Sequence, residues 1–221
     1  MSPSRTMPIA RLLSVSSVLI FLLPLAGCGI FGADEPAFES VTKDESFEVR
    51  DYPPLVVAEV KVSGNQKEAG GRGFRKLAAY IFGGNKSADK IAMTAPVSQI
   101  PSDRSEDTSE KIAMTAPVSQ IEQSDGWLVR FTMPPGYTLE TLPVPDDNDV
   151  KLVELPAARF AVLKFSGNAA EQEVQGKTRQ LLSITREREL SVIGEVTLAQ
   201  YNPPWIPGFF RRNEVMVEVS R

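Results

Sequence analysis

Two related stretches decide the fold of this chain: PPLVVAEVKVSGN at residues 53–65 and PAARFAVLKFSGN at residues 156–168. In register they share a proline, an alanine, a lysine and the closing Ser-Gly-Asn. A strand tolerates proline at its first residue, and Ser-Gly-Asn is a turn signal. We therefore expect two equivalent strands, each of which ends in a turn.

A helical pattern follows each of these strands. Residues 74–81 place apolar side chains on one face before Gly83-Gly84-Asn85 ends the helix, and residues 174–182 repeat the spacing. Two strand-like runs come after each helix, at residues 114–121 and 127–133 in the first half and 195–201 and 214–219 in the second. This order predicts a βαββ unit that occurs twice.

The two units cover about residues 44–135 and 148–221. Such a duplication favours an α+β fold with a pseudo-two-fold axis, in which the sheet curls toward a barrel and one helix from each half lies outside. Two similar halves that meet face to face also leave a groove at their junction, where ligand pockets often occur.

A second repeat lies inside the first half. The sequence KIAMTAPVSQI occurs at residues 90–100 and again, letter for letter, at residues 111–121, with a polar segment between the copies that we expect to be a mobile loop. Apolar side chains alternate at Ile91 and Met93 and at Ile112 and Met114, which predicts a half-buried strand in each copy. The Thr-Ala-Pro that follows predicts a bulge or a strand end.

The N-terminus predicts export and lipidation. Residues 12–26 form an apolar run of signal-peptide length, short of the ~20 residues that a spanning helix needs. Leu25-Ala26-Gly27-Cys28 then resembles the lipobox of bacterial lipoproteins. We expect residues 1–27 to be a signal peptide, Cys28 to carry lipid and residues 28–41 to form a tether. The alternatives are a signal peptide cut at a small-residue site and an uncleaved anchor.

Several classes of function are excluded by composition. The chain contains no histidine and one cysteine, and its net charge is −4. Catalysis by Ser-His-Asp, Cys-His or HExxH sites therefore cannot occur within this chain. No basic stripe favours nucleic acid, and no cluster of carboxylates marks a metal site or an acid–base pair. We expect a binding protein and not an enzyme.

Four ordered motifs carry a family resemblance: FEVRDYPPLVVAEV from residue 47, IFGGN with the KIAMTAPV that follows it, VRFTMP from residue 129, and YNPPWIPGFFRRNEVMVEV from residue 201. Together they resemble the SOUL haem-binding family over about residues 38–221, and we place the domain at residues 42–221. The resemblance implies a distorted β-barrel of two βαββ halves flanked by two helices. It also implies binding of haem or a related tetrapyrrole. A more remote similarity links the chain to effector-binding domains of transcription regulators.

A tetrapyrrole needs apolar walls and cations for its carboxylates. The resemblance and the residue types together suggest a site built from the first helix and the C-terminal segment. Because the chain has no histidine, the resemblance implies that haem lies in an apolar groove without a strong axial ligand, unless a tyrosine, a methionine or a carboxylate ligates the iron. The candidate ligand-binding residues are Phe74, Leu77, Ala78, Tyr80, Ile81, Tyr201, Trp205, Phe209, Phe210, Arg211 and Arg212.

Each group of candidates also has a structural interpretation. The helical residues have the spacing of a core face, and Arg211 and Arg212 could pair with Glu214 or Glu218. We expect a protein tethered to the periplasmic side of a bacterial membrane, where it carries, buffers or scavenges haem. Because Gly29 and not aspartate follows Cys28, the outer membrane is favoured over the inner. The alternatives are a binding module for another amphiphile and an envelope domain that docks another protein.

Overall fold

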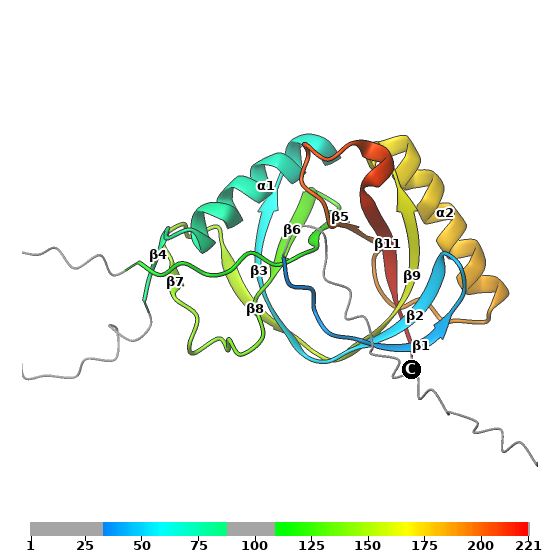
Figure 1. The fold of residues 1–221 in the computed structure, drawn as a ribbon, viewed down its shortest axis with the longest axis horizontal. Helices are drawn as coiled ribbons and strands as arrows, with labels where there is room; N and C mark the ends of the chain where they lie inside the picture. Colours follow the sequence, from blue (N-terminus) through cyan, green and yellow to red (C-terminus); the bar gives the residue numbers. More distant parts are fainter. Residues whose placement is uncertain (1–32, 88–108, 221) are drawn as a thin grey trace, which may run out of the picture.

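The computed structural model describes residues 33–87 and 109–220, which form one large antiparallel sheet with two helices on the same face (Figure 1). The sheet has nine strands in the order β1-β2-β9-β11-β10-β5-β6-β3-β8. They are β1 (Glu39–Lys43), β2 (Phe47–Tyr52), β3 (Leu55–Val62), β5 (Val118–Gln123), β6 (Gly126–Thr132), β8 (Lys151–Leu155), β9 (Ala158–Ser166), β10 (Thr197–Gln200) and β11 (Arg212–Val219).

The predicted duplication is visible in the strand order. The first half runs β3-α1-β5-β6 and the second β9-α2-β10-β11, and the pseudo-two-fold axis passes between the paired strands β5 and β10. Each unit begins with one more strand than the sequence predicted. These extra strands are exchanged between the halves, because β2 of the first half pairs with β9 and β8 of the second half pairs with β3.

The sheet is strongly curved (Figure 1). Among the described residues, β1 and β8 lie at its two edges and no strand pairing joins them. The fold is therefore a mixed α/β structure with one large antiparallel sheet and two helices, and closure into a barrel stays a prediction.

The two helices, α1 (Gln66–Ile81) and α2 (Glu171–Glu187), begin side by side at the pseudo-axis. There the Gln66 side-chain amide donates to the carbonyl oxygen of Ala169 at 3.1 Å. Asn65 caps α1 by accepting from the backbone N–H of Glu68 at 3.0 Å. Because a Cβ at Gly73 would lie 2.5 Å from Val129, α1 can approach β6 only with glycine at that position.

The strand predicted at residues 114–121 begins later than expected, at Val118. The alternation of Ile112 and Met114 does not mark a strand here. Instead, Ile112 enters the core as irregular chain, 2% exposed, and its N–H donates to the carbonyl oxygen of Ile81 at 2.8 Å. Burial in the core explains the apolar side chain of Ile112 without pairing in a sheet. The first copy of the repeat, residues 90–100, lies outside the described residues.

Asn85 connects the two described parts of the chain on either side of residues 88–108. Its amide nitrogen donates to the carbonyl oxygens of Tyr80 at 2.6 Å and Glu110 at 2.9 Å, and its Oδ1 accepts from the N–H of Glu110 at 2.9 Å. It lies in a short ladder formed by β4 (Asn85–Lys86) and β7 (Val144–Pro145). Residues 85 and 110 are therefore neighbours in space.

No helix within residues 33–87 and 109–220 combines the length and the apolar character that crossing a bilayer requires.

We expect Gly73→Ala to destabilise the protein by about 1–3 kcal/mol, because the added methyl group overpacks the contact with Val129. The matched control is Gly71→Ala on the outer side of the same helix, where the nearest atom to a Cβ is a flexible Arg75 nitrogen 3.6 Å away. That change should raise stability by up to about 1 kcal/mol. Urea unfolding measures both, and a Gly73→Ala variant as stable as wild type would contradict the packing.

Candidate functional site

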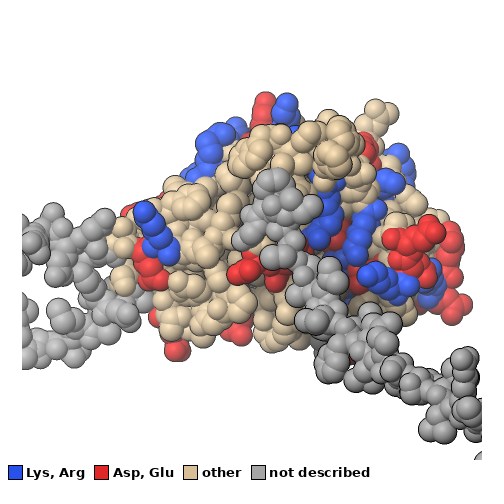
Figure 2. All heavy atoms as spheres, viewed as in Figure 1, with Lys and Arg blue, Asp and Glu red and all other residues tan. Residues whose placement is uncertain are grey.

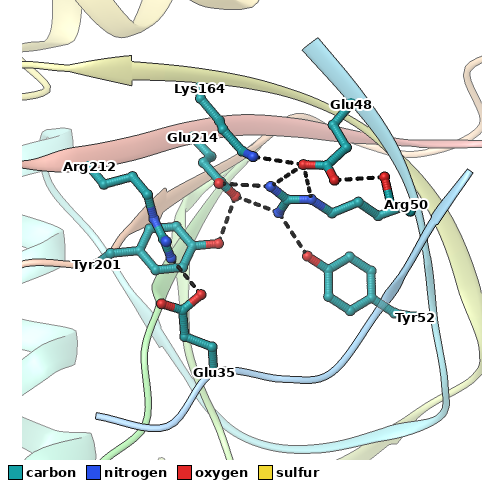
Figure 3. A network of polar contacts seen from close by, with 9 residues as sticks. Glu35, Glu48, Arg50, Tyr52, Lys164, Tyr201, Arg212 and Glu214 are labelled. Carbon is teal, nitrogen blue, oxygen red and sulfur yellow. Dashed lines mark hydrogen bonds and ion pairs between the residues drawn. The ribbon is translucent and has the colours of Figure 1, made fainter. Parts of the chain in front are cut away.

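The face of the sheet away from the helices is concave and carries a cluster of buried charges (Figure 3). Strand β2 alternates, so that Phe47 and Val49 pack in the α2 core while Glu48, Arg50 and Tyr52 project to the concave side. Glu48 and Arg50 are each 2% exposed, and Glu214 from β11 is 1% exposed. Charges buried this deeply need complete pairing.

Arg50 lies at the centre of the cluster, and all five of its N–H donors are used. Nε and Nη2 donate to Glu48 at 3.0 and 2.9 Å, Nη1 and Nη2 donate to Glu214 at 2.8 and 3.0 Å, and Nη1 also donates to the Tyr52 hydroxyl at 3.1 Å. The guanidinium thus joins strands of both halves, and its position is fixed by both carboxylates.

Glu48 is held as a carboxylate. Burial alone would raise its pKa, but hydrogen bonds from Lys164, Ser40 and Arg50, together with the charge of Arg50, outweigh burial and lower its pKa from 4.5 to about 2. The Lys164 ammonium donates at 2.7 Å and the Ser40 hydroxyl at 2.8 Å. The folded protein therefore favours an ionised Glu48 far into acid.

The network continues to the rim of the concave face through Tyr201. Its hydroxyl donates to Glu214 at 2.6 Å, and burial followed by the charge of Glu214 raises the pKa of Tyr201 well above its usual value. The Arg212 guanidinium lies over the Tyr201 ring, with Cζ 3.5 Å from the centroid. Its Nη2 donates to Glu35 at 2.6 Å, whereas its Nε is buried without a partner among the described residues.

Residues 34–38, here called the strap, cross the concave face (Figure 1). Glu35 binds Arg212, and Phe38 covers Arg50, with 4.3 Å between Cζ and the ring centroid. The carbonyl oxygen of Asp34 accepts from the N–H of Ala116 at 2.9 Å. Residues 34–41, expected to belong to the tether, therefore lie against the sheet or in β1.

A second feature is the aromatic loop, residues 202–211, between β10 and β11. Trp205, Phe209 and Phe210 are 75, 73 and 71% exposed. Arg211 stiffens the loop from within, because its Nε donates to the carbonyl oxygen of Ile206 at 2.6 Å and its Nη2 to that of Pro204. The loop therefore presents apolar rings to solvent on a rigid frame.

The aromatic loop borders a shallow, open hollow of ≈ 290 Å³. The loop lies at the top of the sheet in Figure 1, and in the same view Figure 2 shows basic side chains just below the tan surface at that place. The hollow thus combines apolar rings with cations. Its lining residues are Glu45, Ser46, Lys164, Phe165, Ser166, Phe209, Phe210, Arg211 and Arg212.

The structure does not bring all predicted site residues together. Leu77, Tyr80 and Ile81 are at most 1% exposed in the core of the first half, and the Tyr80 hydroxyl donates to the carbonyl oxygen of Pro143 at 2.9 Å. Phe74 is 37% exposed and packs edge-on against Phe131. These residues and the half-buried Ala78 do not line the hollow. Of the C-terminal group, Phe209, Phe210, Arg211 and Arg212 line it, while Tyr201 supports Arg212 and Trp205 stands exposed nearby.

The sequence matches the family model of the SOUL heme-binding protein over residues 33–218. The chain belongs to the SOUL heme-binding protein family. Membership indicates haem or a related tetrapyrrole as the class of ligand. No curated protein matches the sequence.

Solved structures share the fold of this SOUL protein at low identity. It is similar to a hydrolase from Listeria innocua, with 14% identity over 81% of this chain and 94% of the other and a TM-score of 0.51. An uncharacterized conserved protein from Listeria innocua has 13% identity over 81% and 94%, also at 0.51. EcmrR in a complex with DNA has 9% identity over 79% and 57%, at 0.50. At these identities the likeness shows the fold alone.

Sequence reasoning missed the charged cluster of this SOUL domain. Glu48 and Arg50 lie within FEVRDY, where their alternation with apolar residues is typical of a strand with one face in solvent. The strap was missed because the short segment after Cys28, with Gly29, Gly32 and Pro36, resembles a linker. The signal in the sequence was the spacing of Glu48 and Arg50, because two opposite charges two residues apart in a strand lie on the same face of the sheet.

The tyrosines of the SOUL domain are all engaged. Tyr52 accepts from Arg50, and the hydroxyls of Tyr80, Tyr137 and Tyr201 donate to Pro143, Glu110 and Glu214. The pKa of each is raised, by burial first for Tyr52, Tyr80 and Tyr201 and by the Glu110 hydrogen bond first for Tyr137. Neutral, hydrogen-bonded phenols are poor ligands for iron. Within the described ranges, no group of three or more Cys, Asp or Glu residues could hold a metal ion.

The lowered pKa of Glu48 predicts the acid sensitivity of the fold. Its contribution is complete above pH 4.5 and is lost as the pH falls toward about 2, because the unfolded chain takes up the proton first. Glu48→Gln should cost about 3 kcal/mol at pH 7, since it leaves buried cations underpaired, and should flatten the loss of stability between those pH values. The exposed Glu122→Gln is the control, and urea unfolding across the pH range is the measurement. A Glu48→Gln variant with the wild-type slope would contradict the assignment.

Proposed function

We propose that this protein binds haem or a related tetrapyrrole at the aromatic loop and carries, buffers or scavenges it beside a bacterial membrane. The observation that carries the proposal is the exposure of Trp205, Phe209 and Phe210, each at least 71%, on a rigid loop beside Arg212. Three large apolar rings rarely stay in water without a partner. Family membership supports a tetrapyrrole as that partner.

The residues present fit the chemistry of the ligand. A tetrapyrrole is a flat apolar disc with carboxylates at its rim, so it needs aromatic surface and cations at adjoining positions. The Phe209 and Phe210 rings offer the surface, with their centroids 4.4 Å apart. Lys164 and Arg212 line the same hollow, and the Arg212 Nε lacks a partner among the described residues. An unpaired donor beside apolar rings suits a carboxylate.

The ligand would be held by shape and charge, without a strong axial ligand. The sequence contains no histidine, and the four tyrosines are hydrogen-bonded as described above. Bound haem supplies a redox-active iron, while the residues of this chain enclose the ring and pair its carboxylates. Such a site suits transport or storage better than catalysis.

The location at a membrane is part of the proposal. Residues 1–27 would be removed as a signal peptide and Cys28 would carry lipid, on the periplasmic side of the outer membrane. Two or more acyl chains anchor stably, whereas one binds only marginally. Ala33, the first described residue, follows Cys28 by five positions, about 17 Å of extended chain. The binding domain would thus stay close to the lipid surface.

Hemin titration of the soluble domain should give a saturable, shifted Soret band. Phe210→Ala and Trp205→Ala should each weaken binding by about tenfold, because each removes a large apolar contact. The matched control is Phe82→Ala, which removes a ring that is 58% exposed and does not line the hollow.

A fourth variant, Phe74→Ala, separates the loop from the first helix. If Phe74→Ala abolishes binding and the loop variants do not, the ligand lies on α1 and the proposed site is wrong. If hemin gives only the spectrum of free hemin in buffer, the ligand is another amphiphile or a protein partner.

Cys28→Ser should move the protein from the membrane fraction to the soluble fraction of the exported material. The reason is the loss of the only thiol available for acylation. Metabolic labelling with a palmitate analogue and fractionation provide the two measurements. Retention of Cys28→Ser in the membrane would point to an uncleaved anchor instead.

A further inference from the structure

Arg212 is held ready for an anion by a chain of contacts that begins in the core. The guanidinium lies on the Tyr201 ring, the Tyr201 hydroxyl is fixed by Glu214, and Glu214 is fixed by two hydrogen bonds from Arg50 (Figure 3). Arg50 and Glu214 are 2 and 1% exposed, whereas the Arg212 side chain is 41% exposed. The orientation of the Arg212 fork is therefore set without help from its anionic partner.

That partner, Glu35, uses only part of the fork. A comparison within the same protein is Arg159, which grips Asp51 with both Nε at 2.8 Å and Nη2 at 2.7 Å. Arg212 contacts Glu35 through Nη2 alone, and its Nε, buried by the surrounding chain, has no partner among the described residues. A buried guanidinium N–H left unpaired is costly, so Glu35 is an incomplete occupant of this position.

The second contact of the strap is apolar. Phe38 lies 4.3 Å from the Arg50 guanidinium and 5.4 Å from the Tyr52 ring, and it is still 39% exposed. The side chains of Arg212 and Glu35 are 41 and 35% exposed. The strap therefore places one carboxylate and one aromatic ring on the concave face through contacts that water reaches. Contacts of this kind are readily exchanged.

We propose that Glu35 and Phe38 hold the place of an amphiphilic carboxylate at the rim of the concave face. The ligand's carboxylate takes both Nε and Nη2 of Arg212, its apolar part covers Arg50 and Tyr52, and the strap leaves. If the ligand is a tetrapyrrole, this inference rests on the proposed function, because both place a carboxylate of the ligand on Arg212. The strap then acts as a built-in competitor, and the affinity depends on the fraction of molecules in which it is released.

Competition makes a counter-intuitive prediction, which is that weakening the strap tightens binding. Titration of the full chain with protoporphyrin IX should give Glu35→Gln and Phe38→Ala affinities about two- to fivefold higher than wild type, the range expected for losing one partly exposed contact. Glu39→Gln is the control, because it removes the same charge from the neighbouring strand without contacting Arg212. The dimethyl ester of the porphyrin, which lacks free carboxylates, should bind wild type at least about tenfold more weakly.

Hydrogen exchange reports on the strap without relying on affinity. The N–H of Ala116 donates to the carbonyl oxygen of Asp34, so its exchange should accelerate on porphyrin binding and, without ligand, in Glu35→Gln. If every variant binds porphyrin as wild type does and Ala116 stays protected, this inference fails while the proposed function stands. Weaker binding by Phe38→Ala would also overturn it, since Phe38 would then be a wall of the site. If no variant binds porphyrin, the proposed function fails as well.

Discussion

Arg50 must have every one of its five N–H groups paired, because its side chain is buried between the strap and the sheet. Two carboxylates and a phenol meet that demand, and they come from β2 and β11, which belong to different halves of the chain. A slip of β2 by one residue would turn Glu48 and Arg50 into the apolar core against α2. The pairing thereby sets the register at which the exchanged strand meets the second half.

The same constraint explains what could be predicted from the sequence. The strand-turn-helix repeat was predictable because Ser-Gly-Asn, helical spacing and β-rich runs are local signals, and β3, α1, β9 and α2 confirm it. The exchange of β2 and β8 was not, because it depends on which strands meet across the molecule. The strand predicted around Ile112 was wrong for a related reason. An apolar residue that is buried in irregular chain cannot be told from one in a strand by its type alone.

The candidate site divides along similar lines. The prolines at positions 203, 204 and 207 lack the backbone N–H that a strand needs, and Trp205, Phe209 and Phe210 accordingly lie exposed on a loop. The helical candidates Leu77, Tyr80 and Ile81 are core residues, because a helix in an α/β fold must bury one face against its sheet.

The two halves of the chain differ in the connection between their last two strands. In the first half a two-residue turn joins β5 to β6. At the start of β6 the backbone packs closely, because a Cβ at Gly126 would lie 2.4 Å from the carbonyl oxygen of Val62. In the second half the aromatic loop joins the equivalent strands, β10 and β11. The proposed binding surface thus lies where the two halves differ.

Asn85 has a consequence for how this gene can change. By bonding both to the end of α1 and to Glu110, it holds the two described parts of the chain next to each other on either side of residues 88–108. The entropic cost of closing a loop rises only slowly with its length, so residues added between these anchors would cost little free energy of folding. Removing residues 90–110 or residues 101–121 would yield the same protein, because the repeat is perfect. Gain of that unit would lengthen the segment between the two anchors, whereas its loss would remove Glu110 and leave Asn85 to pair with the residue that replaces it.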